Sequence, residues 1–194
     1  MENFVMNVQT LSQQGNFNEL NEFLQKNMEL LVRNPAHLST VLETLDIQQH
    51  SLGVLAVMSA KLQQSQINDW DDLFNRLSIF ITDCNGEQIR YASQSFAELC
   101  HLFAEQLVKN NMPLVGLSPL LKAISKLQMN GKCLTSVHAD VARLALVSKC
   151  FTRPVMDLLE VDYHEISPEA RSNTKNILLF FYYGGMINAS VKVR

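Results

Sequence analysis

The side chains best suited to chemistry in this chain are five histidines and four cysteines, and they are scattered along it. The histidines show no HExxH pattern and no pair at the spacing of metal ligands; they are His37, His50, His101, His138 and His164. The cysteines form no CxxC pair; they are Cys84, Cys100, Cys133 and Cys150. A structural zinc site needs four such ligands close together. We therefore predict no metal site, no cofactor, and cysteines that are reduced and mostly buried.

Two short pairings come closest to a catalytic arrangement. Cys100 and His101 are adjacent, and neighbouring side chains on a helix point about 100° apart, so the two cannot hold one metal ion by themselves. His138 precedes Asp140 on a predicted helix, where a core or capping histidine is a commoner role than a general base. A cysteine nucleophile would also need an orienting group, which no local motif supplies. We predict no catalytic residues, with a thiol or metal enzyme as the least favoured alternative.

Other polar and glycine-containing segments have structural interpretations. Gly184-Gly185 belongs to no phosphate-binding pattern and is predicted to let two helices approach closely. The carboxylates of Asp69, Asp71 and Asp72 suit the start of a helix better than a catalytic pair. A set of basic residues is interpreted as a solvated face, with contact to an acidic partner left open; it comprises Lys122, Lys126, Lys132, Arg143, Lys149 and Arg153.

Composition limits the class of protein. The chain has 194 residues, of which 47% are hydrophobic and 18% charged, so it has enough apolar material for a core. Lys and Arg together number 16 against 19 Asp and Glu, which argues against binding to nucleic acid. Met1–Met6 does not resemble the start of a secretory signal, and no apolar run is long enough to cross a membrane. We expect an intracellular protein without a nucleic acid, membrane or small-molecule ligand.

The elements that must position these residues are predicted to be helices, because apolar residues recur every three or four positions. The spacing predicts a helix from Phe17 to Leu31 that Asn34-Pro35 ends, and one from His50 to Leu62 that is apolar on nearly every side. Asn68-Asp69 is predicted to cap the next helix. One long helix is expected from Ile89 to Leu107.

The second half of the chain continues the pattern. Pro113 is predicted to lie in the first turn of a helix, and Thr135 or Ser136 to cap another that runs through Val147. Further predictions are a helix at Phe151–Leu159, an acidic loop at Asp157–Glu169 and a final helix at Thr174–Ala189. By run length alone Ser78–Thr82 and Ile177–Tyr183 could be strands, but we predict helices there because helical spacing flanks both.

These elements predict an all-α fold: an irregular helical-repeat solenoid of tetratricopeptide-like antiparallel helix pairs, with nine or more helices and no sheet, over residues 1–194 as a single domain. The core is predicted to include Trp70, Phe96, Leu99, Phe103 and Val141. The final helix is apolar on more than one side, so we expect it to expose an apolar patch that includes Phe181 or Tyr183. Such a patch predicts self-association or dependence on a partner.

Several segments, in the same order along the chain, resemble the subunit 3 family of the COP9 signalosome. They are Asp46–Val57, Cys84–Ala92, Gln128–Asn130, Leu134–Asp140, Lys149–Phe151 and Tyr182–Ile187. The resemblance implies a helical-repeat arm of a multisubunit isopeptidase that removes a ubiquitin-like modifier from cullins. It also implies a non-catalytic scaffold, in agreement with the absence of the zinc subunit's His-x-His motif from this sequence.

The resemblance further implies partners, location and chain organisation. The partners would be neighbouring scaffold subunits of the COP9 signalosome and, indirectly, cullin–RING ubiquitin ligases, in the cytoplasm and nucleus. Family members continue into a winged-helix PCI domain, which we expect to be absent from residues 1–194. The alternative to a signalosome subunit is a free-standing helical-repeat adaptor that binds peptides in a groove. That adaptor would need basic residues to hold a carboxylate, and the irregular repeats do not present such a set.

Overall fold

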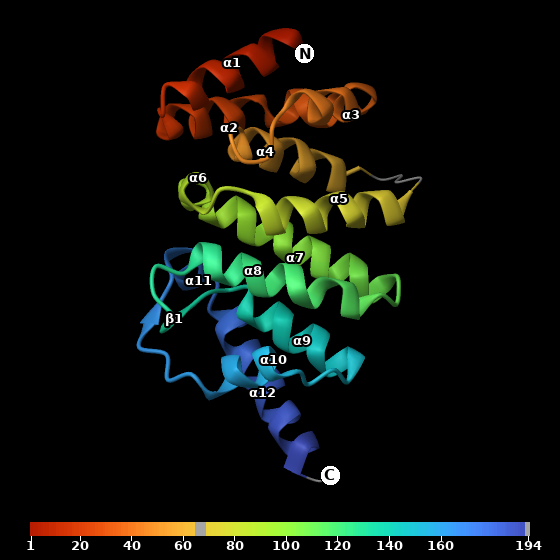
Figure 1. The fold of residues 1–194 in the computed structure, drawn as a ribbon, viewed down its shortest axis with the longest axis vertical. Coiled ribbons are helices and arrows are strands. Elements are labelled where there is room, and N and C mark those ends of the chain that lie inside the picture. Colours follow the sequence, from red (N-terminus) through yellow and green to blue (C-terminus); the bar gives the residue numbers. More distant parts are fainter. Residues whose placement is uncertain (65–68, 193–194) are drawn as a thin grey trace. The chain divides into compact units, whose positions relative to one another are not determined.

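The computed structural model describes residues 1–64 and 69–192 (Figure 1). These residues form twelve α-helices, one 3-10 helix and two strands of two residues each. The predicted all-α, helical-repeat fold class is confirmed, as is the expectation of nine or more helices. Contacts divide the chain into two compact units, Met1–Leu99 and Cys100–Arg194, and each is described by itself. The single-domain organisation stays a prediction.

The described residues of unit 1 are mainly helical. Neighbouring pairs α1 and α2, α2 and α4, and α3 and α4 pack together. The helices are α1 (Glu2–Gln13), α2 (Phe17–Arg33), α3 (Pro35–Thr44), α4 (Ser51–Leu62), α5 (Trp70–Asp83), α6 (Gly86–Arg90) and the first part of α7 (Ser93–Lys109). The predicted helical state of Ser78–Thr82 is confirmed within α5.

Local signals in the sequence explain where these helices begin and end. Gly15 has φ of 70°, a left-handed conformation that suits glycine, and it follows Gln14, the C-cap residue of α1. Pro35 occupies the first turn of α3, so α2 ends before it as predicted. The Asp69 carboxylate accepts a hydrogen bond of 3.0 Å from the Asp72 amide and caps α5. The Asn68 part of that predicted cap lies outside the described residues.

Two expectations for unit 1 are wrong in detail. The predicted long helix is interrupted at Tyr91 and Ala92, where the chain turns between α6 and α7. Trp70 is half-buried, because it stands in the first turn of α5 and packs on one side against Phe74, with ring centroids 5.3 Å apart. The other predicted core residues are confirmed as buried; they are Phe96, Leu99, Phe103 and Val141.

One close helix contact in unit 1 depends on Gly53 of α4. A β-carbon at Gly53 would lie 2.5 Å from Cγ1 of Val8 and 3.4 Å from Cδ1 of Leu45. Val8 is fully buried, and its β-branched side chain has one strongly preferred rotamer on a helix. The Val8 side chain therefore has little freedom to move aside, and α1 can approach α4 only because position 53 lacks a side chain.

Replacing Gly53 by alanine is expected to lower the free energy of unfolding by about 1 kcal/mol. Helix propensity alone favours alanine by about 1 kcal/mol, but overpacking a fixed side chain costs about 1–3 kcal/mol. Urea unfolding of Gly53→Ala measures the net effect. The same substitution in a Val8→Ala background should stabilise the chain instead, because the clashing methyl groups are gone. A stabilising Gly53→Ala in the native background would contradict this packing.

Unit 2 comprises the rest of α7 and the elements that follow it. Helix α9 packs against η1, α8, α10 and α12. The elements are η1 (Pro113–Gly116), α8 (Leu117–Leu127), β1 (Cys133–Leu134), α9 (His138–Ser148), α10 (Arg153–Glu160), β2 (Glu165–Ile166), α11 (Pro168–Arg171) and α12 (Thr174–Lys192). The predicted helical state of Ile177–Tyr183 is confirmed within α12.

The expectation of no sheet is corrected by one short strand pair. β1 and β2 run parallel, with Cys133 paired to Glu165 and Leu134 paired to Ile166. The Ser167 amide extends this pairing by donating to the Leu134 carbonyl at 3.0 Å. The segment predicted as an acidic loop, Asp157–Glu169, thus contains β2, the end of α10 and the start of α11. Two residues per strand are too few to produce an alternating hydrophobic pattern.

The start of α9 also differs from the prediction. Neither Thr135 nor Ser136 caps the helix with its side chain; Val137 is the capping residue. The Thr135 amide donates to Nδ1 of His138 at 3.0 Å, and the Thr135 hydroxyl lies 2.8 Å from the same nitrogen. The segment before α9 is therefore held by the imidazole of His138 rather than by a hydroxyl cap.

Candidate interaction surface

Helix α12 is anchored to unit 2 by one face. Phe180, Gly184 and Ile187 are buried on this face, at the spacing of successive helical turns. Gly184 allows a close approach, since a β-carbon there would lie 3.0 Å from Cδ2 of Leu159. The predicted packing role of the glycine pair is therefore confirmed for Gly184, whereas Gly185 has nothing within 4 Å of such a carbon.

The opposite face of α12 is apolar and exposed. It carries Leu178, Phe181, Tyr182 and Met186, whose exposed fractions are 70%, 59%, 61% and 41%. These four residues are here called the α12 outer face. Phe181, Tyr182 and Met186 lie three, four and eight positions after Leu178, so all four share one side of the helix. Figure 1 shows the C-terminal half of α12 extending past the other labelled elements of unit 2. A helix that is apolar all round is normally buried, so the outer face suits a further protein surface.

The predicted exposed patch is confirmed for Phe181 and corrected for Tyr183. Tyr183 is half-buried and lines a hollow between α7, α9 and α12. The second outward aromatic is Tyr182, which contacts Tyr183 with ring centroids 5.5 Å apart. A run of consecutive aromatic residues on a helix points in several directions, and only the packing of α12 on α9 decides which of them face outward.

Substituting glutamate at Phe181 or Tyr182 is expected to reduce association of the chain with itself at high concentration. Each substitution places a charge on the outer face and leaves the buried residues of α12 unchanged. Light scattering and sedimentation measure association, and circular dichroism should show unchanged helix content. The expectation fails if the unmodified chain is already monomeric at high concentration and neither substitution changes its behaviour.

The cysteines and histidines that could take part in chemistry have mainly structural roles. Cys84, Cys100 and Cys133 are buried as predicted, and burial raises the pKa of the Cys133 thiol. His37 and His164 are exposed, while the buried His50 accepts a hydrogen bond of 3.1 Å from the Asp46 amide. Across residues 1–64 and 69–192, no three His, Cys, Asp or Glu side chains are grouped to hold a metal ion.

His138 is a fully buried histidine in an aromatic setting. The rings of Tyr163 and Phe180 meet it edge-on, with centroids 5.1 Å and 5.5 Å away. Burial lowers the pKa of the imidazole to about 4, because the charged form loses its hydration. Nδ1 accepts from the Thr135 amide, so the neutral ring carries its proton on Nε2. The predicted core or capping role is confirmed.

A histidine–carboxylate pair that local spacing did not reveal joins α7 to α9. Nδ1 of His101 makes a short hydrogen bond to Oδ2 of Asp140, 39 residues further along the chain. Nε2 of the same ring lies 3.1 Å from the side-chain amide nitrogen of Asn176 on α12. One imidazole therefore connects three helices of unit 2.

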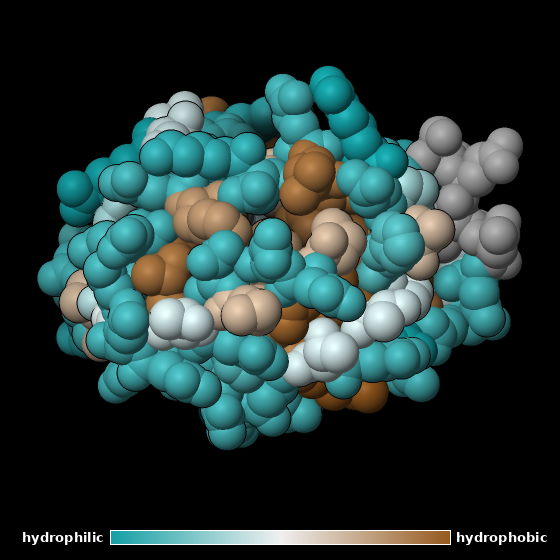
Figure 2. Space-filling model, turned by 90° about the horizontal axis from the view of Figure 1, so that it is seen from above, coloured by the Kyte–Doolittle hydropathy of each residue, from teal (hydrophilic) through white to brown (hydrophobic). Residues whose placement is uncertain are grey.

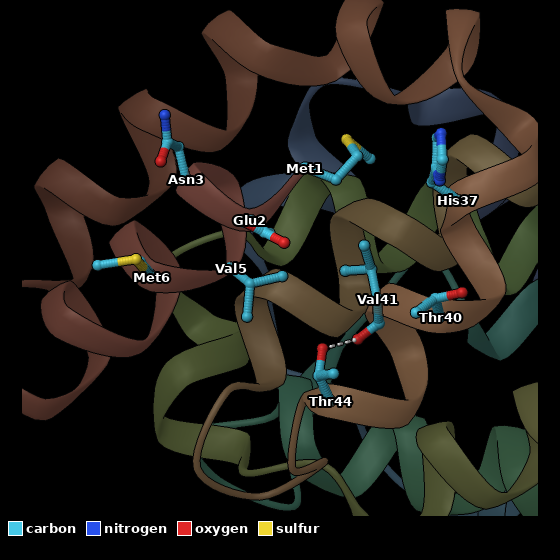
Figure 3. A pocket seen from close by; sticks show the side chains of 9 residues that line it. All are labelled: Met1, Glu2, Asn3, Val5, Met6, His37, Thr40, Val41 and Thr44. Carbon is cyan, nitrogen blue, oxygen red and sulfur yellow. Dashed lines mark hydrogen bonds between the residues drawn. The ribbon is translucent and has the colours of Figure 1, made fainter.

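A second hollow lies between α1 and α3 in unit 1 (Figure 3). Val5, Val41 and Thr44 are among the residues that line it, and the Thr44 hydroxyl donates to the Val41 carbonyl at 2.8 Å. Its titratable side chains, Glu2 and His37, are both exposed. Figure 2, which views the chain from this end, shows hydrophobic residues in small groups among hydrophilic ones. The hollow has no convergent set of polar groups of the kind that fixes a small ligand.

The length and apolar composition of the described helices can be compared with those of a membrane-spanning helix. In residues 1–64 and 69–192, no helix has both the length and the apolar composition that a membrane span requires. The apolar residues of α12 are instead divided between its buried face and its outer face.

Comparison with known proteins gives one family. Residues 14–193 match the family described as "COP9 signalosome complex subunit 3, N-terminal helical repeats". Relatives named COP9 signalosome complex subunit 3 include one from Drosophila melanogaster, 39% identical, and one from Dictyostelium discoideum, 32% identical. Each alignment covers 99% of this chain but 47% and 45% of the respective relative. The chain thus spans about half the length of the curated relatives that it matches.

Proposed function

Because the chain belongs to the COP9 signalosome subunit 3 family of N-terminal helical repeats, we propose that it is a non-catalytic scaffold segment of the COP9 signalosome. In this role it supports a complex that removes a ubiquitin-like modifier from cullins and thereby regulates cullin–RING ubiquitin ligases. Its direct partners are neighbouring signalosome subunits, and its location is the cytoplasm and nucleus.

The α12 outer face is the observation that carries this proposal. Leu178, Phe181 and Tyr182 are each more than half exposed on a helix whose other face is packed. Burying apolar surface contributes about 25 cal/mol per Å², so covering several such side chains favours association with a partner. The titratable groups support a scaffold over an enzyme, since His138 is enclosed by aromatic rings and His101 is held between two helices.

Co-purification tests the proposal directly. The tagged chain is co-expressed with the remaining signalosome subunits in cells that lack their own subunit 3, and we expect those subunits to be recovered with it. The control is the Phe181→Glu/Tyr182→Glu double variant, which keeps the fold and should recover several-fold less. Recovery of no signalosome subunit by the unmodified chain would overturn the proposal.

A free-standing peptide-binding adaptor stays the second candidate. It would bind ligands without the signalosome, and the outer face of one helix is a flat apolar surface rather than a groove. An adaptor would therefore be indicated if the chain co-purified with other proteins through the same two aromatic residues, and with no signalosome subunit.

A further inference from the structure

Asn-Gly is the dipeptide in which an asparagine side chain loses its amide most readily, and this chain contains it twice. The two copies are Asn85-Gly86 and Asn130-Gly131. Deamidation begins when the backbone nitrogen of the following residue attacks Cγ of the asparagine. A glycine at that position has no side chain to hinder the attack, and its backbone adopts conformations that other residues rarely reach. The surroundings of each copy therefore decide which of the two reacts.

Asn85-Gly86 is held by several contacts within unit 1. Asn85 caps α6, and its side-chain oxygen accepts a hydrogen bond of 2.9 Å from the Glu87 amide. Its own amide donates at 2.8 Å to the hydroxyl of Ser51, which is fully buried. The buried Gln88 donates to two backbone carbonyls just before α4 and so fixes α6 in place. Attack of the Gly86 nitrogen on Cγ of Asn85 would therefore require the helix cap to break and Gly86 to leave α6.

Asn130-Gly131 lies in an exposed turn between α8 and β1 of unit 2. The Cys133 amide closes the turn by donating to the Asn130 carbonyl at 3.3 Å, and the Lys132 amide donates to the Asn130 side-chain oxygen at 3.0 Å. Among residues 1–64 and 69–192, no group accepts a hydrogen bond from the Gly131 amide. Exposed hydrogen bonds of this kind open at little cost. The Gly131 nitrogen can therefore reach Cγ of Asn130 while α8 and β1 stay folded.

We propose that Asn130 is a site of spontaneous deamidation and that the reaction loosens the pairing of β1 with β2. The Gly131 nitrogen forms a bond to Cγ of Asn130, and the side-chain amide leaves as ammonia with the proton of that nitrogen. The product is a five-membered succinimide ring. Water then opens the ring at one of its two carbonyl carbons. One opening gives aspartate, and the other gives isoaspartate, in which the backbone runs through the former side chain.

The Asn130 side chain links the turn before β1 to β2. Its Nδ2 donates to Oε2 of Glu165, the first residue of β2, at 3.0 Å. Aspartate at position 130 puts a carboxylate in place of this donor, so the hydrogen bond is lost and two like charges meet. Isoaspartate also lengthens the backbone of the turn that the Cys133 amide closes. Each strand has only two residues, so few other hydrogen bonds hold the pair together.

Other charges near this link moderate the repulsion. Glu165 shares a hollow with Asp162, Lys132 and His164, and Nε2 of His164 lies 3.9 Å from Oδ2 of Asp162. The exposed ammonium of Lys132 offsets part of the added negative charge, and salt screens the remainder. The lost hydrogen bond and the altered turn therefore account for most of the expected effect on β1 and β2.

Peptide mapping by mass spectrometry tests the site on the whole chain. The folded chain is incubated at mildly alkaline pH, and deamidation is followed at both Asn-Gly copies. We expect Asn130 to react at least about tenfold faster than Asn85, because only Asn85 must wait for a helix to open. In concentrated urea the two rates should become similar, since both copies then lie in unfolded chain. This comparison separates the effect of the fold from that of the neighbouring sequence.

Two further measurements follow the products. An L-isoaspartyl methyltransferase with a labelled methyl donor counts isoaspartate; Asn130→Gln should remove most of the label, whereas Asn85→Ser keeps a capping oxygen and should leave it unchanged. Hydrogen exchange then reports the strand pair, with Asn130→Asp representing the aspartate product and Asn130→Gln as its uncharged control. The Ser167 amide, which donates to the Leu134 carbonyl, should exchange several-fold faster in Asn130→Asp than in Asn130→Gln.

Each part of the proposal has an outcome that overturns it. Deamidation of Asn85 as fast as that of Asn130 in the folded chain would show that the turn at Asn130 is no more reactive than the capped one. If Asn130 reacts faster, yet the Ser167 amide exchanges equally in Asn130→Asp and Asn130→Gln, the effect on β1 and β2 is wrong. Both measurements use the free chain, so neither result depends on the scaffold role.

Discussion

Replacing Phe96 by alanine should lower the free energy of unfolding by about 3–5 kcal/mol, the largest effect that we expect from one substitution. Phe96 is fully buried on α7 within unit 1 and meets the ring of Phe80 on α5 edge-on, with centroids 6.2 Å apart. Truncation removes this aromatic contact and leaves a cavity between two helices. Urea unfolding followed by circular dichroism measures the loss.

The control for Phe96→Ala is the same substitution at Phe181, whose ring is 59% exposed. Phe181→Ala should change the free energy of unfolding by no more than about 0.5 kcal/mol. Should Phe96→Ala fail to fold, Phe96→Leu keeps most of the volume and should lose less than about 1.5 kcal/mol. An unfolding midpoint for Phe96→Ala equal to that of the unmodified chain would show that the packing of α5 on α7 is wrong.

Lowering the pH should reduce the free energy of unfolding by about 3 kcal/mol through the protonation of His138 alone. Unfolded, this histidine has a pKa near 6.5, whereas burial lowers its pKa to about 4 in the folded chain. Between those two values the unfolded state binds the proton and the folded state does not. The stabilisation is therefore fully present above about pH 6.5 and is lost progressively as the pH falls to about 4.

The variant His138→Asn isolates this effect from other titrations. Asparagine does not titrate, and its side-chain oxygen can accept from the Thr135 amide as Nδ1 does. We expect the free energy of unfolding of the unmodified chain to fall by about 3 kcal/mol more than that of His138→Asn between pH 7 and pH 4. Equal pH dependence of the two proteins would mean that His138 is solvated in the folded state.

Most helices of this chain could be predicted because their signals are local. Asn34-Pro35 separates α2 from α3, and Asp69 caps α5, through contacts within one turn of the chain. The helical state of Ile177–Tyr183 followed from the spacing of apolar residues on either side. A helix is specified by neighbours three and four positions away, so a single sequence contains the information.

The features that sequence reasoning missed depend on residues far apart in the chain. The pairing of Cys133 with Glu165 joins two strands that are separated in the sequence by α9 and α10. Neither strand is long enough to show an alternation of apolar and polar residues. The break between α6 and α7 occurs at Tyr91 and Ala92 with no proline or glycine to mark it. Tertiary packing decides such positions.

The candidate surface was predictable in part. That the last helix would expose apolar residues followed from the run of Ile177 to Tyr183, but the choice of Tyr182 over Tyr183 as the outward residue depends on how α12 packs on α9. The link from His101 to Asp140 spans 39 residues and three helices meet there, so no local motif could indicate it. The same holds for Arg143 and Lys175, which share a hollow only in the folded chain.

The central claim is that the α12 outer face is covered when the chain joins other signalosome subunits. Hydroxyl-radical footprinting of the free chain and of the co-purified complex measures this at Met186, with Met129 as an exposed reference outside the proposed contact. We predict that oxidation of Met186, relative to Met129, falls several-fold in the complex, together with labelling of Phe181 and Tyr182. An unchanged ratio of Met186 to Met129 oxidation in the assembled complex would contradict the claim.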